Sequence, residues 1–149
     1  MDTVLQLITA FFGSMGFALI FHIRGNLILP ASLGGMLEWG VYLIASHYLG
    51  GIFLPCLVTS AFSAFYAELL ARYYKAPATV FFIPAIIPLI PGSKLYYTMS
   101  YAVQGRWVIS ADYRMRTLKI TLGIGAGISL VWSLQYMLHK IMEKRRTAK

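Results

Sequence analysis

The sequence predicts an all-α fold, a polytopic membrane helix bundle with about five hydrophobic segments and one proline-broken helix. Three observations carry this prediction. Of the 149 residues, 58% are hydrophobic and only 12% are charged, which is typical of integral membrane proteins. The charges fall in clumps, which leaves apolar windows close to the roughly 20 residues that span a hydrocarbon core. Four of the six prolines lie in one such window.

We expect a single membrane domain over 1–149, with no linker or soluble appendage. Its hydrophobic segments are expected at about 3–23, 31–48, 52–71, 77–92 and 118–139. A stretch rich in Tyr and Trp, 94–117, precedes the last segment and is predicted to lie at the membrane interface, which these residues favour. A basic tail, 140–149, follows the last segment. No basic residue precedes the first segment, so we expect it to be retained as a helix and not cleaved as a signal.

The basic residues leave two orientations open. If all five segments cross the bilayer, eight Lys and Arg residues lie on the side of the tail and five on the other. If 77–92 instead enters and returns on one side, two groups of five exchange places and the count stays eight against five. Because the tail is the densest basic cluster, we favour five crossings with the tail in the cytoplasm and the N-terminus outside.

Several functional classes find no support in the composition. The net charge of +8 is concentrated beside a membrane span, which favours a lipid anchor over nucleic-acid binding. Cys56 is the only cysteine, so no disulfide or thiolate cluster can form within the chain. The histidines lack ligand-like spacing, and no metal site or cofactor is expected. No nucleophile or metalloprotease motif is visible, so we expect no enzyme.

The prolines of the fourth segment, Pro77, Pro84, Pro88 and Pro91, are spaced seven, four and three residues apart. In a continuous helix they would share one face, and each would remove the hydrogen bond to the carbonyl four residues earlier. A carbonyl without a hydrogen bond destabilises the protein when it faces lipid. It is tolerated where it is buried in protein or lines a water-filled cavity. The spacing therefore predicts a broken helix inside the bundle.

The residues that follow the break can recognise a carboxylate. Gly92 offers a backbone N–H, Ser93 and Tyr96 offer hydroxyls, and Lys94 offers a cation. Broken helices recur at transporter binding sites because half-helix ends present free backbone groups and dipole charge. These residues, with Pro84, Pro88 and Pro91, are candidates for binding or gating. The alternative is a kinked structural helix that ends in a Pro-Gly turn, with Lys94 extending to the interface.

Three further charges are candidates. Glu38 falls near the middle of the second segment, where acidic side chains usually mark a substrate or proton pathway. It can serve as a proton carrier, or it can be a protonated group hydrogen-bonded to a neighbouring helix. Glu68 and Arg72 are four residues apart, on one helix face. They form either an interfacial ion pair or part of a gate near the proline break.

The last segment contains "GIGAG", with Gly123 and Gly127 four residues apart. The surroundings are apolar and no strand precedes the motif, so a nucleotide-binding loop is excluded. Small residues at this spacing let two membrane helices approach closely. We therefore predict a helix contact at these glycines.

Two stretches, "SMGFALIFHIRGNLILPASLGGMLEWGVYL" and "YAELLARYYKAPATVFFIPAIIPLIPGSKLYYTM", together resemble the threonine/serine exporter family, ThrE. The features "AELLAR" and "IPLIPG" carry most of the likeness. The resemblance is to the C-terminal membrane half, which some members have as a separate small subunit. The resemblance implies an exporter. Members in which both halves are fused export threonine and serine, and members encoded by two genes are associated with export of the dicarboxylate succinate.

The resemblance also implies a partner, a second membrane subunit equivalent to the N-terminal half of the family. Five short spans can hardly enclose a substrate path by themselves, which also favours a second subunit. A homo-oligomer of this chain is the competing arrangement. The expected function is that of a small subunit of a secondary exporter in a bacterial cytoplasmic membrane, moving a small carboxylate substrate. A non-transporting assembly subunit and a membrane-embedded enzyme are the alternatives.

Overall fold

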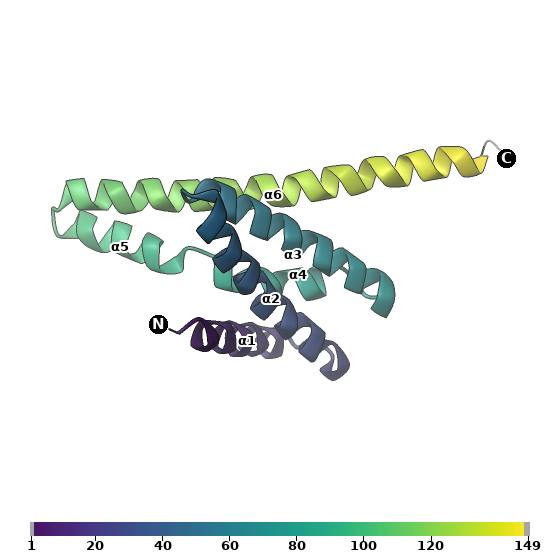
Figure 1. Cartoon of the computed structure of the whole chain (residues 1–149). Helices are drawn as coiled ribbons and strands as arrows, with labels where there is room; N and C mark the ends of the chain where they lie inside the picture. Colours follow the sequence, from purple (N-terminus) through teal and green to yellow (C-terminus); the bar gives the residue numbers. More distant parts are fainter. Residues whose placement is uncertain (1, 148–149) are drawn as a thin grey trace.

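A computed structural model describes residues 2–147 of the chain, except for the side chains of 139 and 141–147 (Figure 1). The described residues form six α-helices and one short 3₁₀ helix, with no strand, which confirms the all-α prediction. In chain order these are α1 (Thr3–Ile20), α2 (Gly25–Leu49), α3 (Phe53–Tyr74), α4 (Thr79–Ile86), η1 (Ile87–Leu89), α5 (Gly92–Val103) and α6 (Trp107–Thr147). The end of the predicted basic tail, 148–149, lies outside the described residues.

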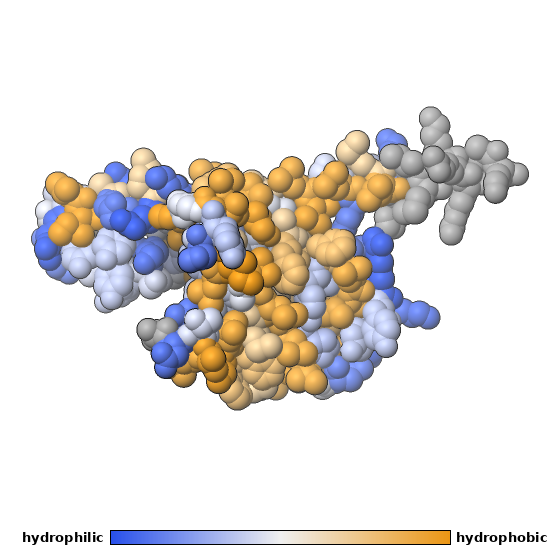
Figure 2. Space-filling view, viewed as in Figure 1, coloured by the Kyte–Doolittle hydropathy of each residue, from blue (hydrophilic) through white to orange (hydrophobic). Residues whose placement is uncertain are grey.

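Four helices, α1, α2, α3 and α6, are long and apolar enough to cross a membrane. The pair formed by α4–η1 and α5 is bent by 49° and adds a fifth span if it is counted as one. The predicted proline-broken helix is therefore confirmed. Figure 2 shows hydrophobic residues over the bundle. Hydrophilic residues gather on the α5–α6 hairpin and, away from it, where α2 begins and α3 ends. The chain is a multi-pass membrane protein.

Two helices begin earlier than the sequence predicts. The second begins at Gly25 and contains Pro30, so the Asn26 carbonyl lacks the helical hydrogen bond that an N–H at position 30 would give. The carbonyl of Pro30 accepts a hydrogen bond from the Tyr66 hydroxyl at 2.8 Å. The last helix begins at Trp107 and includes much of the stretch 94–117, which also supplies α5. A tight turn with Gly105 at φ +72° joins the two helices.

Glycines set the closest helix contacts, as predicted. A Cβ on Gly123 would lie 2.7 Å from the Phe53 carbonyl oxygen, and a Cβ on Gly127 would collide with Ser60 and with the Leu57 carbonyl. Both glycines therefore let α6 lie against the backbone of α3, as small residues do in membrane bundles. Because Gly123 meets the start of α3 and Gly127 meets its second turn, the two helices run parallel.

The proline segment lies in the interior of the bundle and runs back along α3. Phe81 of α4 packs with Ala67 in the second half of α3, and Leu89 of η1 packs with Cys56 near its start. Pro84 and Phe81 are fully buried, and Leu89 is 5% exposed. The missing helical hydrogen bonds of this segment are thus sheltered by protein, as the cost of exposing them to lipid requires.

Candidate functional site

The break in the fourth segment spans Ile87 to Pro91. Since Pro88 and Pro91 have no N–H, the α-helical ladder ends at Ile86. The Ile90 N–H instead bonds the Ile87 carbonyl at 3.2 Å, and the Gly92 N–H bonds the Ile90 carbonyl at 2.8 Å. Ile90 is in an extended conformation, and α5 then begins at Gly92. The break therefore redirects the chain, and α5 continues at 49° to α4 and η1.

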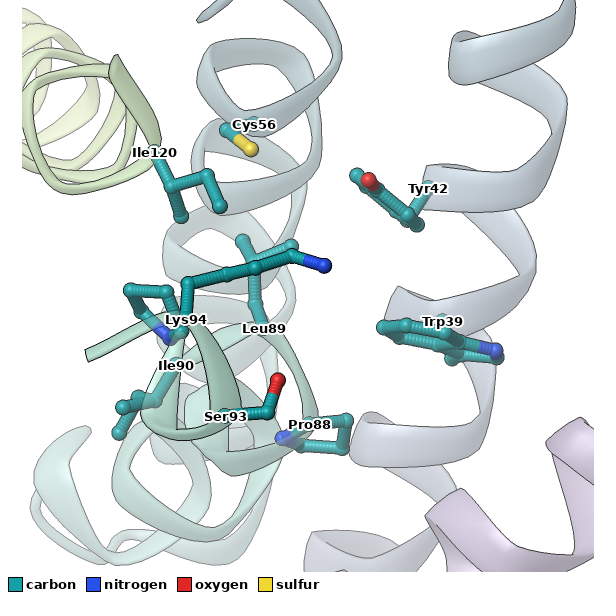
Figure 3. A pocket seen from close by; sticks show the side chains of 10 residues that line it. Trp39, Tyr42, Cys56, Pro88, Leu89, Ile90, Ser93, Lys94 and Ile120 are labelled. Atoms are coloured by element: carbon teal, nitrogen blue, oxygen red, sulfur yellow. The ribbon is translucent and has the colours of Figure 1, made fainter. Parts of the chain in front are cut away.

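A cavity of about 240 Å³ lies at this break (Figure 3). Residues of α2, α3, α5, α6 and the proline break line it: Trp39, Tyr42, Cys56, Pro88, Leu89, Ile90, Pro91, Ser93, Lys94 and Ile120. In Figure 3 the side chain of Lys94 extends across the cavity and its amino group points towards α2, where Trp39 and Tyr42 lie. The rings of Trp39 and Tyr42 are stacked with centroids 5.0 Å apart.

This cavity combines groups that suit a small carboxylate. The Lys94 ammonium is its only charged lining group among the described residues, and a lysine binds an anion as a compact point charge with three donors. The hydroxyls of Ser93 and Tyr42 add neutral hydrogen-bonding capacity. The stacked faces of Trp39 and Tyr42 can hold an apolar group or, by cation–π attraction, an ammonium group.

Deeper in the bundle, four buried side chains form a polar cluster: Ser14 of α1, Glu38 of α2, and Thr59 and Ser63 of α3. All four are at most 1% exposed. The Ser63 hydroxyl faces the Glu38 carboxyl, yet no oxygen of the four side chains completes a hydrogen bond of standard geometry. Most buried polar atoms in proteins do have such a bond. The polar cluster is thus an unusual concentration of unsatisfied oxygen atoms.

A second cavity, of about 450 Å³, lies between α1, α2 and η1. Its lining residues are Gln6, Thr9, Ala10, Gly13, Trp39, Ile87 and Pro88. Trp39 and Pro88 line both cavities. They therefore form the partition between the cationic cavity at the break and this more apolar one.

The sequence-predicted site residues fall into three groups. Pro88, Pro91, Ser93 and Lys94 line the first cavity together, and Gly92 lies between them at the start of α5. Pro84 and Glu38 lie deeper: both are buried, and the Pro84 carbonyl oxygen would be 3.5 Å from a Cβ on Gly35, one helical turn before Glu38.

The third group lies apart from the cavity. Tyr96 is 66% exposed and contacts Tyr97, with ring centroids 5.5 Å apart. Glu68 and Arg72 form an ion pair at 3.3 Å in the second half of α3, far along the helix from Cys56. Their side chains are 25% and 54% exposed, respectively.

Sequence reasoning missed the residues that other helices bring to these sites. Trp39 and Tyr42 are three residues apart, as are Gly35 and Glu38, while Thr59 and Ser63 are four apart, so each pair shares a helix face. This spacing was the available signal. Among the described residues, no group of three or more His, Cys, Asp or Glu side chains could hold a metal ion.

A family model described as Threonine/Serine exporter, ThrE, matches residues 6–134. The match covers most of the chain and includes every residue of the two cavities and the polar cluster. No match was found among curated proteins or among solved structures. The family match confirms the resemblance carried by "AELLAR" and "IPLIPG". It agrees with the multi-pass architecture and the broken helix: the chain belongs to the threonine/serine exporter family, ThrE.

Proposed function

We propose that the chain is the small membrane subunit of a two-component secondary exporter in a bacterial cytoplasmic membrane. Its substrate is a small carboxylate metabolite, either threonine or serine or a dicarboxylate such as succinate. The substrate path passes along the broken fourth span. Membership of an exporter family supports transport and not catalysis as the role of the cavity.

The observation that carries this proposal is the position of the Lys94 side chain in the cavity at the break. A lysine that only extended to the membrane interface would have no reason to cross a cavity lined by Trp39 and Tyr42. Lys94 instead supplies a positive charge where the chain is redirected, which is where transporters with broken helices bind charged substrates. One substrate carboxylate pairs with this ammonium.

A second membrane subunit, equivalent to the N-terminal half of the family, would complete the path. Ser93 is exposed and Lys94 is only partly buried within this chain, so the cavity reaches the surface of the chain. A substrate path must be closed to lipid along its length. The second subunit would supply the missing wall.

The test compares two lysine variants in cells that contain the second subunit. Lys94→Met removes the cavity charge and is expected to reduce substrate efflux at least tenfold, while Lys119→Met removes an exposed charge of α6 outside the cavity and should leave efflux unchanged. Membrane abundance of both variants is measured alongside. If Lys94→Met exported normally, or if loss of the whole chain left efflux unchanged, an assembly role would replace the proposal.

A further inference from the structure

The polar cluster contains five unpartnered side-chain oxygen atoms: Ser14 Oγ, both carboxyl oxygens of Glu38, Thr59 Oγ1 and Ser63 Oγ. All lie in the interior of the bundle. Leaving a buried polar group without a partner destabilises the folded state. Because all five atoms belong to one cluster, a shared ligand explains them better than five separate packing defects would.

The helix faces bring these oxygens towards one place. Gly35 and Glu38 lie one turn apart on α2, and Thr59 and Ser63 lie one turn apart on α3. The Ser14 hydroxyl lies directly against Gly35, where a Cβ would collide with it. Long helical side chains point back towards the helix N-terminus, so the Glu38 carboxyl is directed towards the level of Gly35.

A backbone oxygen reaches the same place. The Pro84 carbonyl lies 3.5 Å from the position of a Cβ on Gly35. Pro88, four residues later, has no N–H to satisfy that carbonyl. The Ser14 hydroxyl of α1 and the Pro84 carbonyl of α4 therefore meet at Gly35, one helical turn before Glu38, which Ser63 of α3 faces.

The kind of ligand follows from these atoms. All donors are oxygens, which hard cations prefer. The cluster has one carboxylate, and no cationic side chain forms an ion pair with it among the described residues, so a single positive charge would balance it. A protonated Glu38 can exchange a hydrogen bond with the Ser63 hydroxyl that faces it. One small monovalent metal ion, by contrast, can bind the oxygen atoms of all four side chains and of the Pro84 carbonyl together.

We propose that Ser14, Glu38, Thr59, Ser63 and the Pro84 carbonyl form a sodium-binding site. Carbonyls at the C-terminal ends of broken helices serve this purpose in transporters of other folds. Binding of the ion does not depend on the proposed export function. Its use as a coupling ion rests on that function, because the Pro84 carbonyl links the site to the segment that lines the substrate cavity.

The first experiment measures binding without transport. The purified full-length chain is melted in sodium chloride, potassium chloride and choline chloride at equal ionic strength and fixed pH. A ligand that binds only the folded state raises the melting temperature with its concentration. We expect a concentration-dependent rise in sodium that is absent in potassium and choline. Equal melting temperatures in the three salts would overturn the proposal.

Matched variants locate the site. Ser63→Ala and Thr59→Val keep the size of the side chain but remove a ligand oxygen, and each is expected to weaken the sodium response at least fivefold in concentration. Glu38→Gln should abolish it. Ser32→Ala is the control, because the Ser32 hydroxyl is also buried on α2 but already bonds the Ile28 carbonyl at 2.8 Å. A sodium response that survives both Ser63→Ala and Thr59→Val would refute the assignment even if Glu38→Gln does not fold.

The same measurements separate this proposal from the export function. Lys94→Met should lose efflux but keep the sodium-dependent rise in melting temperature. A protein that responds to pH but not to sodium has a proton carrier only, and the sodium site is then wrong while the exporter proposal stands. A sodium response in a protein without efflux supports the site and contradicts the exporter.

Discussion

The indole N–H of Trp39 donates a hydrogen bond to Gln6 Oε1 at 3.1 Å, which joins α1 to α2 beside the proline break. Trp39 also stacks on Tyr42 and lines both cavities. A hydrogen bond and a ring contact therefore position the Trp39 side of the partition between the two cavities. Neither contact is strong, since a single hydrogen bond contributes about 0.5–1.5 kcal/mol net.

Trp39→Phe tests this partition. The change keeps an aromatic face but removes the N–H, so the side chain should leave its position more often. We expect passive leak of substrate down its gradient to rise about threefold to tenfold, the range that about 1 kcal/mol allows. Leak is measured as uncoupled efflux from vesicles. Trp132→Phe, a change in a ring that packs on Phe82 away from both cavities, is the control; equal leak from both variants would contradict the prediction.

Pro88→Ala should lower transport more than it lowers assembly. Alanine restores an N–H that can bond the Pro84 carbonyl, so α4 can continue through η1 and the cavity changes shape. Pro91→Ala should act in the same direction at the start of α5. Efflux and the amount of folded protein in the membrane are measured together. Pro77→Ala, before α4 and exposed, should change neither. Parallel loss of efflux and assembly would mean that the break is structural.

Gly127→Ala should destabilise the contact between α3 and α6 by about 1–3 kcal/mol, the usual cost of overpacking. The new methyl group would meet Ser60 and the Leu57 carbonyl. The expected result is a lower melting temperature and less protein in the membrane. Gly125→Ala, which meets nothing within 4 Å, makes the same change two residues away and should be neutral. Similar melting temperatures for the two variants would place the contact elsewhere.

Glu68→Gln should leave efflux within about twofold of the natural chain. The ion pair with Arg72 is partly exposed and within one helix, and such pairs contribute about 0.3–0.5 kcal/mol. It also lies apart from the residues that line both cavities. Efflux and melting temperature are the measurements. A loss of efflux without a loss of stability would show that the pair belongs to a gate.

The break was predictable from the sequence because its cause is local. Pro84, Pro88 and Pro91 interrupt a helix wherever they occur, and Lys94 follows them directly in the chain. The GIGAG contact was predictable for the same reason, since glycine spacing alone marks a close helix approach.

The partners of these residues were not predictable, because they depend on how the helices are aligned. Trp39 and Lys94 line one cavity, and Ser14 lies against Gly35, only because of how α1, α2 and the proline segment pack, which no single helix encodes. The beginning of the last helix was missed for a different reason. The Tyr and Trp residues of 94–117 suggested an interfacial stretch, but these residues are compatible with helix, and α6 begins among them at Trp107.

The length of α6 has a consequence for the whole assembly. At 1.5 Å per residue its 41 residues extend about 60 Å, twice the thickness of a hydrocarbon core of about 30 Å. Gly123 lies against the start of α3, so the residues from Trp107 onward project about 24 Å past that end, with α5 alongside. The α5–α6 hairpin thus extends well beyond the start of α3, and an epitope tag placed at Gly105 would report on which side of the membrane its tip lies.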